Sequence, residues 1–405
     1  MSIKSNFHHT LRASYLGYIT QAVVNSLTPL LFLTFQKTYH ISLNQIAFLV
    51  TINFGTQLMV DFFAAKFVDR IGYRICIVGA HLFAGTGLIG LSILPDLLSH
   101  PYTGLVLSVS CYAIGGGLIE VMLSPIVQAC PVSQKSSAMC FLHSFNCWGQ
   151  VLVVLISTLF FSIAGIEHWS WIVRMWACIP LLNALYFSAV PLRTLAEEER
   201  GASIREMCSM KLFWIFMLLM LCSGGAEQAM SQWASAFAEM GLHVSKTAGD
   251  LAGPCMFALL MGTSRIFYAK YSEKINLQKY ILGSSILCVF SYLLTSLSPL
   301  PILSLLGCGL CGLSIGILWP GIYSMAAEHF STGGTAMFAL LALGGDIGCS
   351  TGPAVVGLVS ASLDNNLKQG LLCAVVFPVL LTAGVVYLRR TAQERKRELV
   401  AECND

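Results

Sequence analysis

Long apolar segments, separated by short charged stretches, make up most of this chain of 405 residues. Windows such as 75–94, 280–298 and 367–388 are almost free of charge, and about 20 apolar residues are what an α-helix needs to cross the hydrocarbon core of a bilayer. Because a helix satisfies its own backbone hydrogen bonds in lipid, the pattern predicts an all-α integral membrane protein. Twelve transmembrane helices are expected, over residues 11–36, 43–68, 74–94, 102–128, 136–165, 169–190, 211–240, 248–270, 279–298, 300–329, 333–361 and 367–388.

The composition agrees with a membrane protein and excludes several other classes. Hydrophobic residues make up 56% of the chain, charged residues 11%, and the mean hydropathy is +0.73, whereas soluble domains carry about 25% charged residues. The small net charge of +3 and the lack of a basic patch argue against a nucleic-acid partner. The 15 cysteines are scattered, and even the Cys308/Cys311 pair lies in a Gly-rich apolar segment without a histidine. We therefore expect packing cysteines, and neither a metal nor a cofactor.

The distribution of Lys and Arg predicts how the chain is oriented in the membrane. Of the 23 Lys and Arg residues, four fall in one set of alternate loops and the other 19 (23 − 4) on the opposite side. The four are Lys37, Arg174, Lys246 and Lys368. Because cytoplasmic loops carry the excess of Lys and Arg, both termini and the central linker are expected in the cytoplasm. We expect a multi-pass protein of the plasma membrane, here a bacterial inner membrane, whose first helix is not a cleaved signal peptide.

Two charged stretches between apolar segments repeat each other. Residues 65–74 read AKFVDRIGYR and residues 269–278 read AKYSEKINLQ, an offset of 204 residues, and SAM at 137–139 returns as TAM at 335–337. A repeat of this length in an apolar chain predicts two homologous, pseudo-symmetric halves of six helices each. We expect an N-terminal half over 1–192, a cytoplasmic linker over 193–210, a C-terminal half over 211–390 and a cytoplasmic tail over 391–405.

The first of these stretches resembles the most diagnostic loop of the major facilitator superfamily. The family pattern is Gly-x-x-x-Asp-Arg-x-Gly-Arg-Arg/Lys. The chain keeps Asp69, Arg70, Gly72 and Arg74, and departs from the pattern at Ala65 and Tyr73. The resemblance implies a transporter of twelve helices that works by alternating access. It also implies that the loop latches the cytoplasmic side, with its Asp near a helix N-terminus and its arginines on carboxylates.

We assign a gating role to this loop, to its counterpart in the second half and to two charges in the adjoining helices. The residues are Asp61, Asp69, Arg70, Gly72, Arg74, Arg265, Lys270, Glu273 and Lys274. For Asp61, one or two turns before the loop, we expect a pairing across the interface, for instance with a basic group. The alternative is that these residues are ordinary cytoplasmic-side charges that obey the orientation rule.

The fourth apolar segment resembles the fucose-permease branch of the superfamily. Its sequence GGGLIEVMLSP, over 115–125, leads from a Gly-rich run to Glu120 and, five residues later, to Pro125. The resemblance implies that Glu120 takes part in proton coupling. That branch also uses an Asp in the first helix, whereas the first segment here has no acid and offers Asn25 as its nearest polar residue.

Carboxyl groups at bilayer depth are costly, so each one is a candidate functional group. Asp61, Glu120, Glu227 and Asp346 lie within apolar segments. A carboxyl group among apolar neighbours tends to hold a proton near neutrality, which is the property that a proton symporter needs. We assign proton coupling to Glu120, Glu227 and Asp346. The alternative for each is a hydrogen-bonded packing residue.

Neutral polar residues recur at helical spacing on four segments. Residues three, four or seven apart share a helix face, which in lipid should point into the bundle. Amides hydrogen-bond hydroxyl groups and aromatic faces stack on sugar rings, although interhelical bonding or core packing alone could explain any one of these residues. No Arg or Lys is expected at the midplane, so the pattern favours a neutral polyol such as a sugar. The candidate substrate-binding residues are Gln21, Asn25, Asn53, Gln57, His143, Asn146, Gln150, Gln228, Gln232, Trp233, Trp319 and Tyr323.

The leading interpretation is a monomeric secondary transporter that takes up a sugar or similar neutral polyol with protons. Its partners would be the small-molecule substrate, the proton and the lipid bilayer. The alternative is a proton-driven exporter of drugs or other amphiphiles with the same fold. A sensor would need an appended signalling domain, and a membrane enzyme would need clustered metal ligands, a nucleophile motif or a phosphate loop; the sequence shows none of these. The sequence leaves open the substrate, the direction of transport and the choice between proton and sodium.

Overall fold

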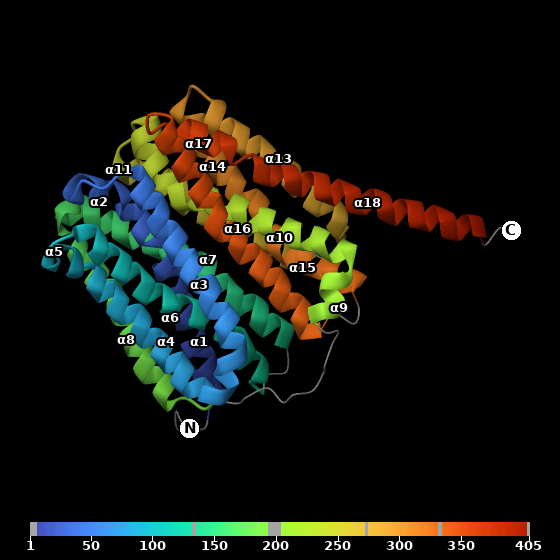
Figure 1. The fold of residues 1–405 in the computed structure, drawn as a ribbon, viewed down its shortest axis with the longest axis horizontal. Helices are drawn as coiled ribbons and strands as arrows, with labels where there is room; N and C mark the ends of the chain where they lie inside the picture. Colours follow the sequence, from blue (N-terminus) through green and yellow to red (C-terminus); the bar gives the residue numbers. More distant parts are fainter. Residues whose placement is uncertain (1–5, 132–134, 193–203, 272–273, 331–333, 403–405) are drawn as a thin grey trace.

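The computed structural model describes residues 6–131, 135–192, 204–271, 274–330 and 334–402. These residues form helices joined by turns and contain no strand. Twelve helices within them are long and apolar enough to cross a membrane, which confirms the expected all-α membrane fold. The helices pack as a bundle, and the last one, α18, projects from it toward the C-terminus (Figure 1).

The spans begin and end close to the expected residues. The first six comprise α1 (Phe7–Ser26), η2 (Thr28–Leu31), α2 (Phe32–Tyr39), α3 (Leu43–Ile71), α4 (Tyr73–Leu91), α5 (Leu94–Leu97), α6 (Pro101–Ala129), α7 (Lys135–Ala164), η3 (Ile166–His168) and α8 (Trp169–Ala189). After α9 (Ile204–Ser209), the next six comprise α10 (Lys211–Ala236), η4 (Phe237–Gly241), α11 (Lys246–Asp250), η5 (Leu251–Cys255), α12 (Met256–Tyr271), α13 (Leu277–Leu297), α14 (Pro301–Ile315), α15 (Leu318–His329), α16 (Gly334–Ser362), α17 (Leu367–Cys373) and α18 (Val376–Glu402). An even number of spans puts both termini on one side of the bundle, named here the termini side; the opposite side is the far side.

Local sequence explains where the helices stop. Ser42 and Gln45 form a capping box at the start of α3, in which the Ser42 N–H donates to Gln45 Oε1 at 2.8 Å. At its end Gly72 has a φ of +97°, a conformation that favours glycine, and turns the chain into α4. At the equivalent place in the repeat, Asn276 caps α13 by accepting from the Lys279 N–H at 3.0 Å. The two repeated stretches therefore occupy equivalent connections.

Pro29 interrupts the first span. α1 ends at Ser26, one 3-10 turn over Thr28–Leu31 follows, and α2 continues. Because proline has no N–H, the carbonyl of Asn25, four residues earlier, lacks its helical donor. That carbonyl becomes available to another helix.

Helix pairings recur between the two parts of the chain. In the first part α1 packs on α7, α3 on α6, and α4 on both α6 and α8. In the second part α10 packs on α16, α12 on α14, and α13 on both α14 and α18. These pairings are equivalent under the repeat in the sequence. We therefore propose the expected division into two six-helix halves, named here the N-half (α1 to α8) and the C-half (α10 to α18).

The two halves meet along two helix pairs, which we call seams. α3 packs on α16 at one seam, and α7 packs on α12 at the other; α3 and α16 lie next to each other in the middle of Figure 1. Under the repeat, α3 corresponds to α12 and α7 to α16, so the seams are equivalent to each other. Motion of one half against the other has to slide or separate these two contacts.

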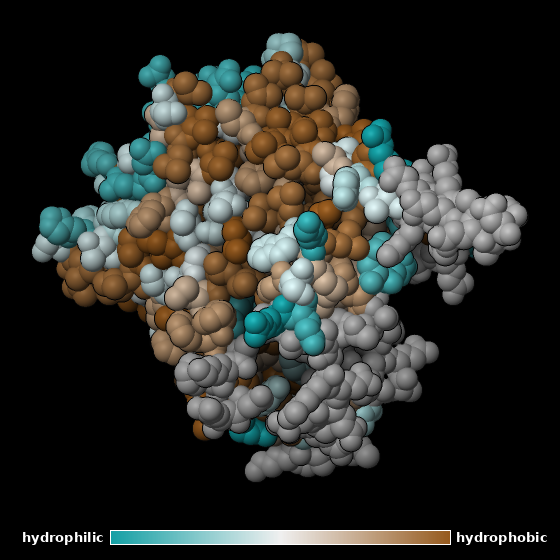
Figure 2. Space-filling model, turned by 45° about the vertical axis from the view of Figure 1, so that its right-hand side comes forward, coloured by the Kyte–Doolittle hydropathy of each residue, from teal (hydrophilic) through white to brown (hydrophobic). Residues whose placement is uncertain are grey.

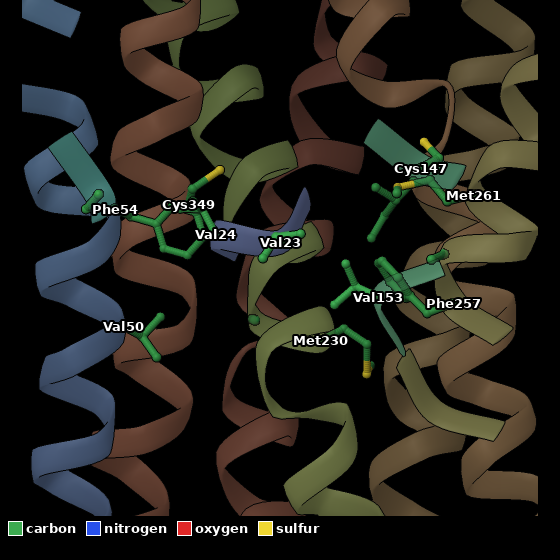
Figure 3. Close-up of a cluster of buried hydrophobic side chains, with 14 of the residues drawn as sticks. Val23, Val24, Val50, Phe54, Cys147, Val153, Met230, Phe257, Met261 and Cys349 are labelled. Carbon is green, nitrogen blue, oxygen red and sulfur yellow. The ribbon is translucent and has the colours of Figure 1, made fainter. Parts of the chain in front are cut away.

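An apolar cluster fills the centre of the interface. Figure 3 shows Phe54 beside Cys349, where α3 meets α16, and Cys147 beside Met261, where α7 meets α12. Met230 of α10 lies between the two seams (Figure 3). All five side chains are at most 7% exposed. Their burial stabilises the present arrangement of the halves and excludes water from its centre.

Large apolar side chains also cover the outside of the bundle. Ile163, Leu182 and Ile302 are 78%, 65% and 80% exposed. Figure 2 shows a broad hydrophobic surface over the described part of one face. Soluble monomers rarely expose apolar patches larger than a few hundred Å², so this surface fits the acyl chains of a bilayer.

Gly348→Ala is expected to destabilise the protein, because α16 and α10 approach too closely for a side chain at this position. A Cβ at Gly348 would lie 2.0 Å from the Leu221 carbonyl oxygen, a main-chain atom that cannot turn away. We expect a cost of about 1–3 kcal/mol, measured as a lower midpoint of thermal unfolding in detergent. Gly283→Ala is the control, since a Cβ there meets no atom within 4 Å. Equal midpoints for the two variants would contradict the close packing.

Candidate functional site

The polar residues predicted on the first two spans face each other and form one amide network. Asn25 Oδ1 accepts from Asn53 Nδ2 (3.2 Å) and from Gln57 Nε2 (3.0 Å). Gln21 Nε2 donates to Gln57 Oε1 at 2.9 Å. Each helix presents its amides four residues apart, so that matching rows on α1 and α3 meet along their length. The structure thus brings together four of the predicted binding residues.

Glu120 joins this network from α6. Its Oε2 accepts from Gln21 Nε2 at 2.8 Å. The Glu120 side chain is exposed although Gln21 beside it is 2% exposed, so the carboxyl group borders a solvent-accessible space inside the bundle. The preceding glycine run explains the close approach of α6, because a Cβ at Gly117 would already lie 3.1 Å from main-chain atoms of Gln57.

Gln232 extends the network into the C-half. Its Nε2 donates to the main-chain carbonyl of Asn25 at 2.9 Å and to Gln228 Oε1 at 3.1 Å. The Asn25 carbonyl is the one that Pro29 leaves without a helical donor. The predicted row on α10 is therefore engaged across the interface in this structure.

Trp233, which we expected to stack on substrate, lies in the packed interface. Its side chain is 1% exposed, and its Nε1 donates to the Pro353 carbonyl at 3.0 Å. Its ring centroid is 5.5 Å from that of Phe32. The ring therefore offers no face to the space beside Glu120 in this state, because α2 and α16 hold it on both sides.

The predicted row on α7 borders the same space. His143 is exposed; its Nδ1 lies 3.2 Å from the Tyr18 hydroxyl and its Nε2 3.4 Å from Ser124 Oγ. Asn146 is half-buried. Gln150 lies farther along the helix, is 7% exposed and lines a small cavity at the interface. The first two residues of the row are thus accessible, and the third is enclosed.

Five buried polar atoms of the predicted site residues have no hydrogen-bond partner within the described part of the chain. They are Gln21 Oε1, Asp61 Oδ1, Asn146 Oδ1, Glu227 Oε2 and Trp319 Nε1. Buried polar atoms are almost always satisfied, by protein, water or a ligand. The Trp319 ring also lies 6.2 Å, centroid to centroid, from that of Tyr323. The hydroxyl groups of a polyhydroxylated ligand can donate to these acceptors and accept from the Trp319 N–H, and its ring can stack on the aromatic faces.

Arg265 contradicts the expectation that no basic residue reaches the midplane. Long basic side chains usually extend toward water, yet this one extends along α12 toward the middle of the bundle. Its Nη1 lies 3.2 Å from Cys147 Sγ on α7, its Nη2 lies 3.9 Å from Met261 Sδ, and its Nε donates to the Gly316 carbonyl at 3.3 Å. The charges of Arg265 and Glu227 act on each other. Sequence position alone did not show where the guanidinium points.

Asp61 pairs with an acid, and not with the basic group that we expected. Asp61 on α3 and Asp346 on α16 hydrogen-bond through their side chains. Both are half-buried, and the charge of Glu120 reaches Asp61. Helical spacing could not reveal this contact, because it depends on which helices of the two halves are neighbours. Among the described residues, no group of three or more His, Cys, Asp or Glu side chains is arranged to hold a metal ion.

The loop arginine Arg74 has a different partner from the carboxylate that we expected. Its Nη1 donates to the carbonyls of Phe187 (2.9 Å) and Ser188 (2.8 Å), and its Nη2 to that of Val190 (2.9 Å). Carbonyls at the end of a helix lack helical donors and attract a cation. Arg74 therefore ties α4 to the end of α8 within the N-half, and in this structure it does not latch the halves together.

The other loop charges are only partly described. The side chains of Asp69 and Arg70, and residue Glu273, lie outside the described residues. The Lys270 ammonium lies 5.5 Å from the centroid of the Tyr271 ring, and Lys274 is exposed. The gating role of these residues stays a prediction.

A charge network closes the bundle on the far side. Lys246 Nζ donates to the Leu30 carbonyl of the N-half at 2.7 Å. It also pairs with Glu239 at 3.3 Å and Asp250 at 3.1 Å in the C-half. Asp250 is fully buried and accepts from Thr158 Oγ1 of α7 at 3.2 Å. The network thus joins η2 and α7 to α11 and η4, so it bridges the two halves.

Sequence reasoning placed Lys246 in an outer loop and did not single out Asp250 or Glu239. One signal was present, because Lys246 and Asp250 are four residues apart, the spacing at which opposite charges meet on a helix. The main-chain partner at Leu30 left no signal in the sequence.

Access to the polar rows is one-sided. On the far side, two cavities between the halves each measure about 10 Å³, which is room for roughly one water molecule. Toward the termini side, Glu120 and His143 are exposed. Within the described residues, the polar rows are therefore accessible toward the termini side and enclosed on the far side.

Lys246→Met is expected to loosen the far-side closure, because it leaves Asp250 buried without its cation. Removing one partner of a buried ion pair costs about 3–5 kcal/mol, so the midpoint of thermal unfolding should fall. A cysteine introduced at Ser231, which lines one of the far-side cavities, should also react faster with a membrane-impermeant maleimide. The same background without the added cysteine corrects for native thiols.

Lys368→Met is the matched control for this variant. Lys368 Nζ donates to the Ser298 carbonyl at 3.1 Å, within the C-half. Labelling at Ser231→Cys should stay at the wild-type rate in this background. Unchanged labelling in the Lys246→Met background would contradict a closing role for the network.

Comparison with known proteins agrees with this architecture. The sequence matches the model of a family described as the Major Facilitator Superfamily over residues 14–353. Membrane protein MosC of Rhizobium meliloti is 21% identical over 359 residues, which cover 88% of this chain and 84% of that protein.

Three solved structures superpose over nearly the whole chain. A D-xylose-proton symporter has a TM-score of 0.77 at 13% identity, covering 95% of this chain and 97% of that one. A bacterial homologue of the human lysosomal transporter Spinster, inward-facing and unoccupied, has a TM-score of 0.76 at 14% identity, covering 95% and 97%. The E. coli fucose:proton symporter has a TM-score of 0.64 at 15% identity, covering 93% and 98%. The structural likeness shows the fold, and the family match shows that the protein belongs to the major facilitator superfamily.

Proposed function

We propose that the protein takes up a sugar or a similar neutral polyol together with protons, by alternating access across a bacterial inner membrane. The observation that supports this most directly is the hydrogen bond from Gln21 to Glu120. It attaches a carboxyl group to a network of amides beside a solvent-accessible space. Amides bond hydroxyl groups, and a carboxyl group takes up and releases a proton. One site thus offers both the binding and the coupling groups.

The charges of the site favour a substrate without net charge. Arg265 reaches the centre of the bundle, but Glu227 offsets it. A strongly anionic substrate would have to displace Glu227, and a cationic one would have to displace Arg265. The likeness to a D-xylose-proton symporter and a fucose:proton symporter supports the same proposal at the level of the fold.

We also propose that the termini side is cytoplasmic, as the Lys and Arg count predicts. The structure is then open to the cytoplasm. Its TM-score is 0.76 against the Spinster homologue described as inward-facing and 0.63 against a fucose permease structure described as outward. This difference supports the proposed state. We expect the protein to work as a monomer.

Uptake into proteoliposomes tests this function. A panel of sugars is offered beside a panel of lipophilic cations, with and without a pH gradient. We expect one or more sugars to accumulate when the outside is more acidic. Transport of lipophilic cations with no sugar uptake would favour the alternative, a proton-driven exporter of drugs or other amphiphiles. Accumulation driven by sodium in place of the pH gradient would contradict proton coupling.

Glu120→Gln is expected to abolish uphill uptake and to spare exchange of labelled for unlabelled sugar. The amide oxygen still accepts from Gln21, but the side chain no longer releases a proton. A gradient of one pH unit sustains about tenfold accumulation per proton, and this accumulation should vanish. Glu167→Gln, at a side chain that is 71% exposed on η3, is the control. Normal accumulation by both Glu120→Gln and Glu227→Gln would remove these two residues from proton coupling.

Gln21→Ala is expected to weaken sugar binding about two- to twelvefold, because a net hydrogen bond is worth about 0.5–1.5 kcal/mol. Gln232→Ala should act in the same direction. Affinity is measured by isothermal titration calorimetry on the purified protein. Gln45→Ala removes an amide of the capping box on the far side and should leave the affinity unchanged. If neither Gln21→Ala nor Gln232→Ala changes the affinity, the amide rows do not bind the sugar.

A further inference from the structure

Asp61 and Asp346 come from different halves, and both members of this contact are acids. The contact lies at the seam between α3 and α16, and the two side chains hydrogen-bond to each other. A carboxylate has no hydrogen to donate. Two carboxylates in contact also repel strongly in a medium of low dielectric constant. One member of the pair therefore has to carry a proton for the contact to exist.

We infer that Asp61 and Asp346 form a binding site for a single proton shared between the two halves, and that the bound proton holds α3 and α16 together. Its role in the transport cycle rests on the proposed proton-coupled function, whereas the proton site itself does not depend on the substrate. Glu120 differs from this pair because its partner Gln21 belongs to the same half. Protonation of the pair acts directly on the relative position of the halves.

Among the residues whose side chains the structure describes, the groups that act on the pair add negative charge and no positive charge. Glu120 on α6 acts on Asp61, and Asp346 acts on Tyr323 of α15 and Cys349 of its own helix. Tyr323 and Cys349 are neutral in their ordinary forms. Glu120 is also the neighbour that borders the space open to the termini side, so it lies on a route by which a proton can reach or leave the pair.

Arg265, the basic residue at the centre of the bundle, interacts with groups other than the two acids. Arg265 on α12 acts on Glu227 of α10, Tyr18 of α1 and His143 of α7. Within the described part of the chain it therefore does not take the place of the proton between the two acids. Two further bases of α3, Lys66 and Arg70, have side chains outside the described residues.

Loss of the proton turns attraction into repulsion. In the bound form one O–H group donates to the opposite carboxylate, and the pair carries a single negative charge. When the proton leaves to water, that O–H bond breaks, the hydrogen bond is lost and both groups become negative.

The helix that carries Asp346 has little freedom to bend away. A Cβ at Gly345 would lie 2.3 Å from the Trp319 ring, and one at Gly348 would lie 2.0 Å from the Leu221 carbonyl oxygen. α16 is thus packed tightly against both α15 and α10. The repulsion is expected to act on the C-half as a body and to separate the seam.

An infrared titration of the purified protein tests the proton site without transport. The carbonyl stretch of a protonated carboxyl group is distinct from the bands of a carboxylate, so its loss as pH rises reports the shared proton. Asp61→Asn and Asp346→Asn should each remove the same titrating band, because the pair binds one proton. Asp96→Asn is the control: Asp96 is exposed and accepts from the Tyr39 hydroxyl at 2.9 Å, and the band should persist without it.

The variants are chosen to keep the contact while removing the titration. An Asn amide donates to the remaining carboxylate, and the double variant leaves two amides that can bond each other. If a single variant fails to fold, the double variant gives the same readout. A band that persists in both single variants, or in the double variant, would overturn the proton site. So would a titration that shifts with sodium at constant ionic strength, which would make the pair a sodium site.

Transport then tests the role of the pair in the cycle. For a sugar that the wild type accumulates about tenfold under one pH unit, both single variants should reach only equilibration, while exchange continues. Normal accumulation by both variants would overturn the coupling role. If the wild type takes up no sugar at all, the proposed function fails, and the infrared titration still decides the proton site.

Discussion

A charge at bilayer depth has to be offset by an opposite charge, a hydrogen bond or a proton, because lipid offers no water to solvate it. Lys246 meets this demand with two acids and a carbonyl, and Glu120 with the amide of Gln21. One of these partners, the Leu30 carbonyl, belongs to the opposite half. When the halves move, a charge that is partnered across the interface loses that partner and needs another. The free-energy cost of an unpartnered charge therefore links ion binding to the relative position of the halves.

The two seams are equivalent in fold but different in chemistry. The seam of α3 and α16 carries two acids, Asp61 and Asp346, whereas the seam of α7 and α12 places the Arg265 guanidinium against the Cys147 thiol. A change in protonation acts on the first seam and leaves the charge at the second unaltered. The repeat thus places two equivalent helix contacts between the proposed halves, and the side chains at these contacts differ in charge.

The spans, the repeat and the amide rows could be predicted because each is a periodic feature of the sequence. The row on α3 shows the benefit: Gln57 stands four residues after Asn53, and both point into the bundle, where they donate to Asn25 of α1. The missed features are not periodic. The pairing of Asp346 with an acid of the other half depends on which helices are neighbours. The inward course of Arg265 depends on the rotamers of a flexible side chain, and the carbonyl that Lys246 binds belongs to the main chain, which sequence patterns do not report.

Two bonds that cross the interface end on main-chain oxygens of the first span, those of Asn25 and Leu30. A substitution at Leu30 would alter the side chain and leave the acceptor in place. What must be preserved is the course of the backbone around Pro29, which removes the helical donor of the Asn25 carbonyl. This part of the closure is therefore sensitive to the backbone conformation that Pro29 imposes, and less so to the side chains at positions 25 and 30.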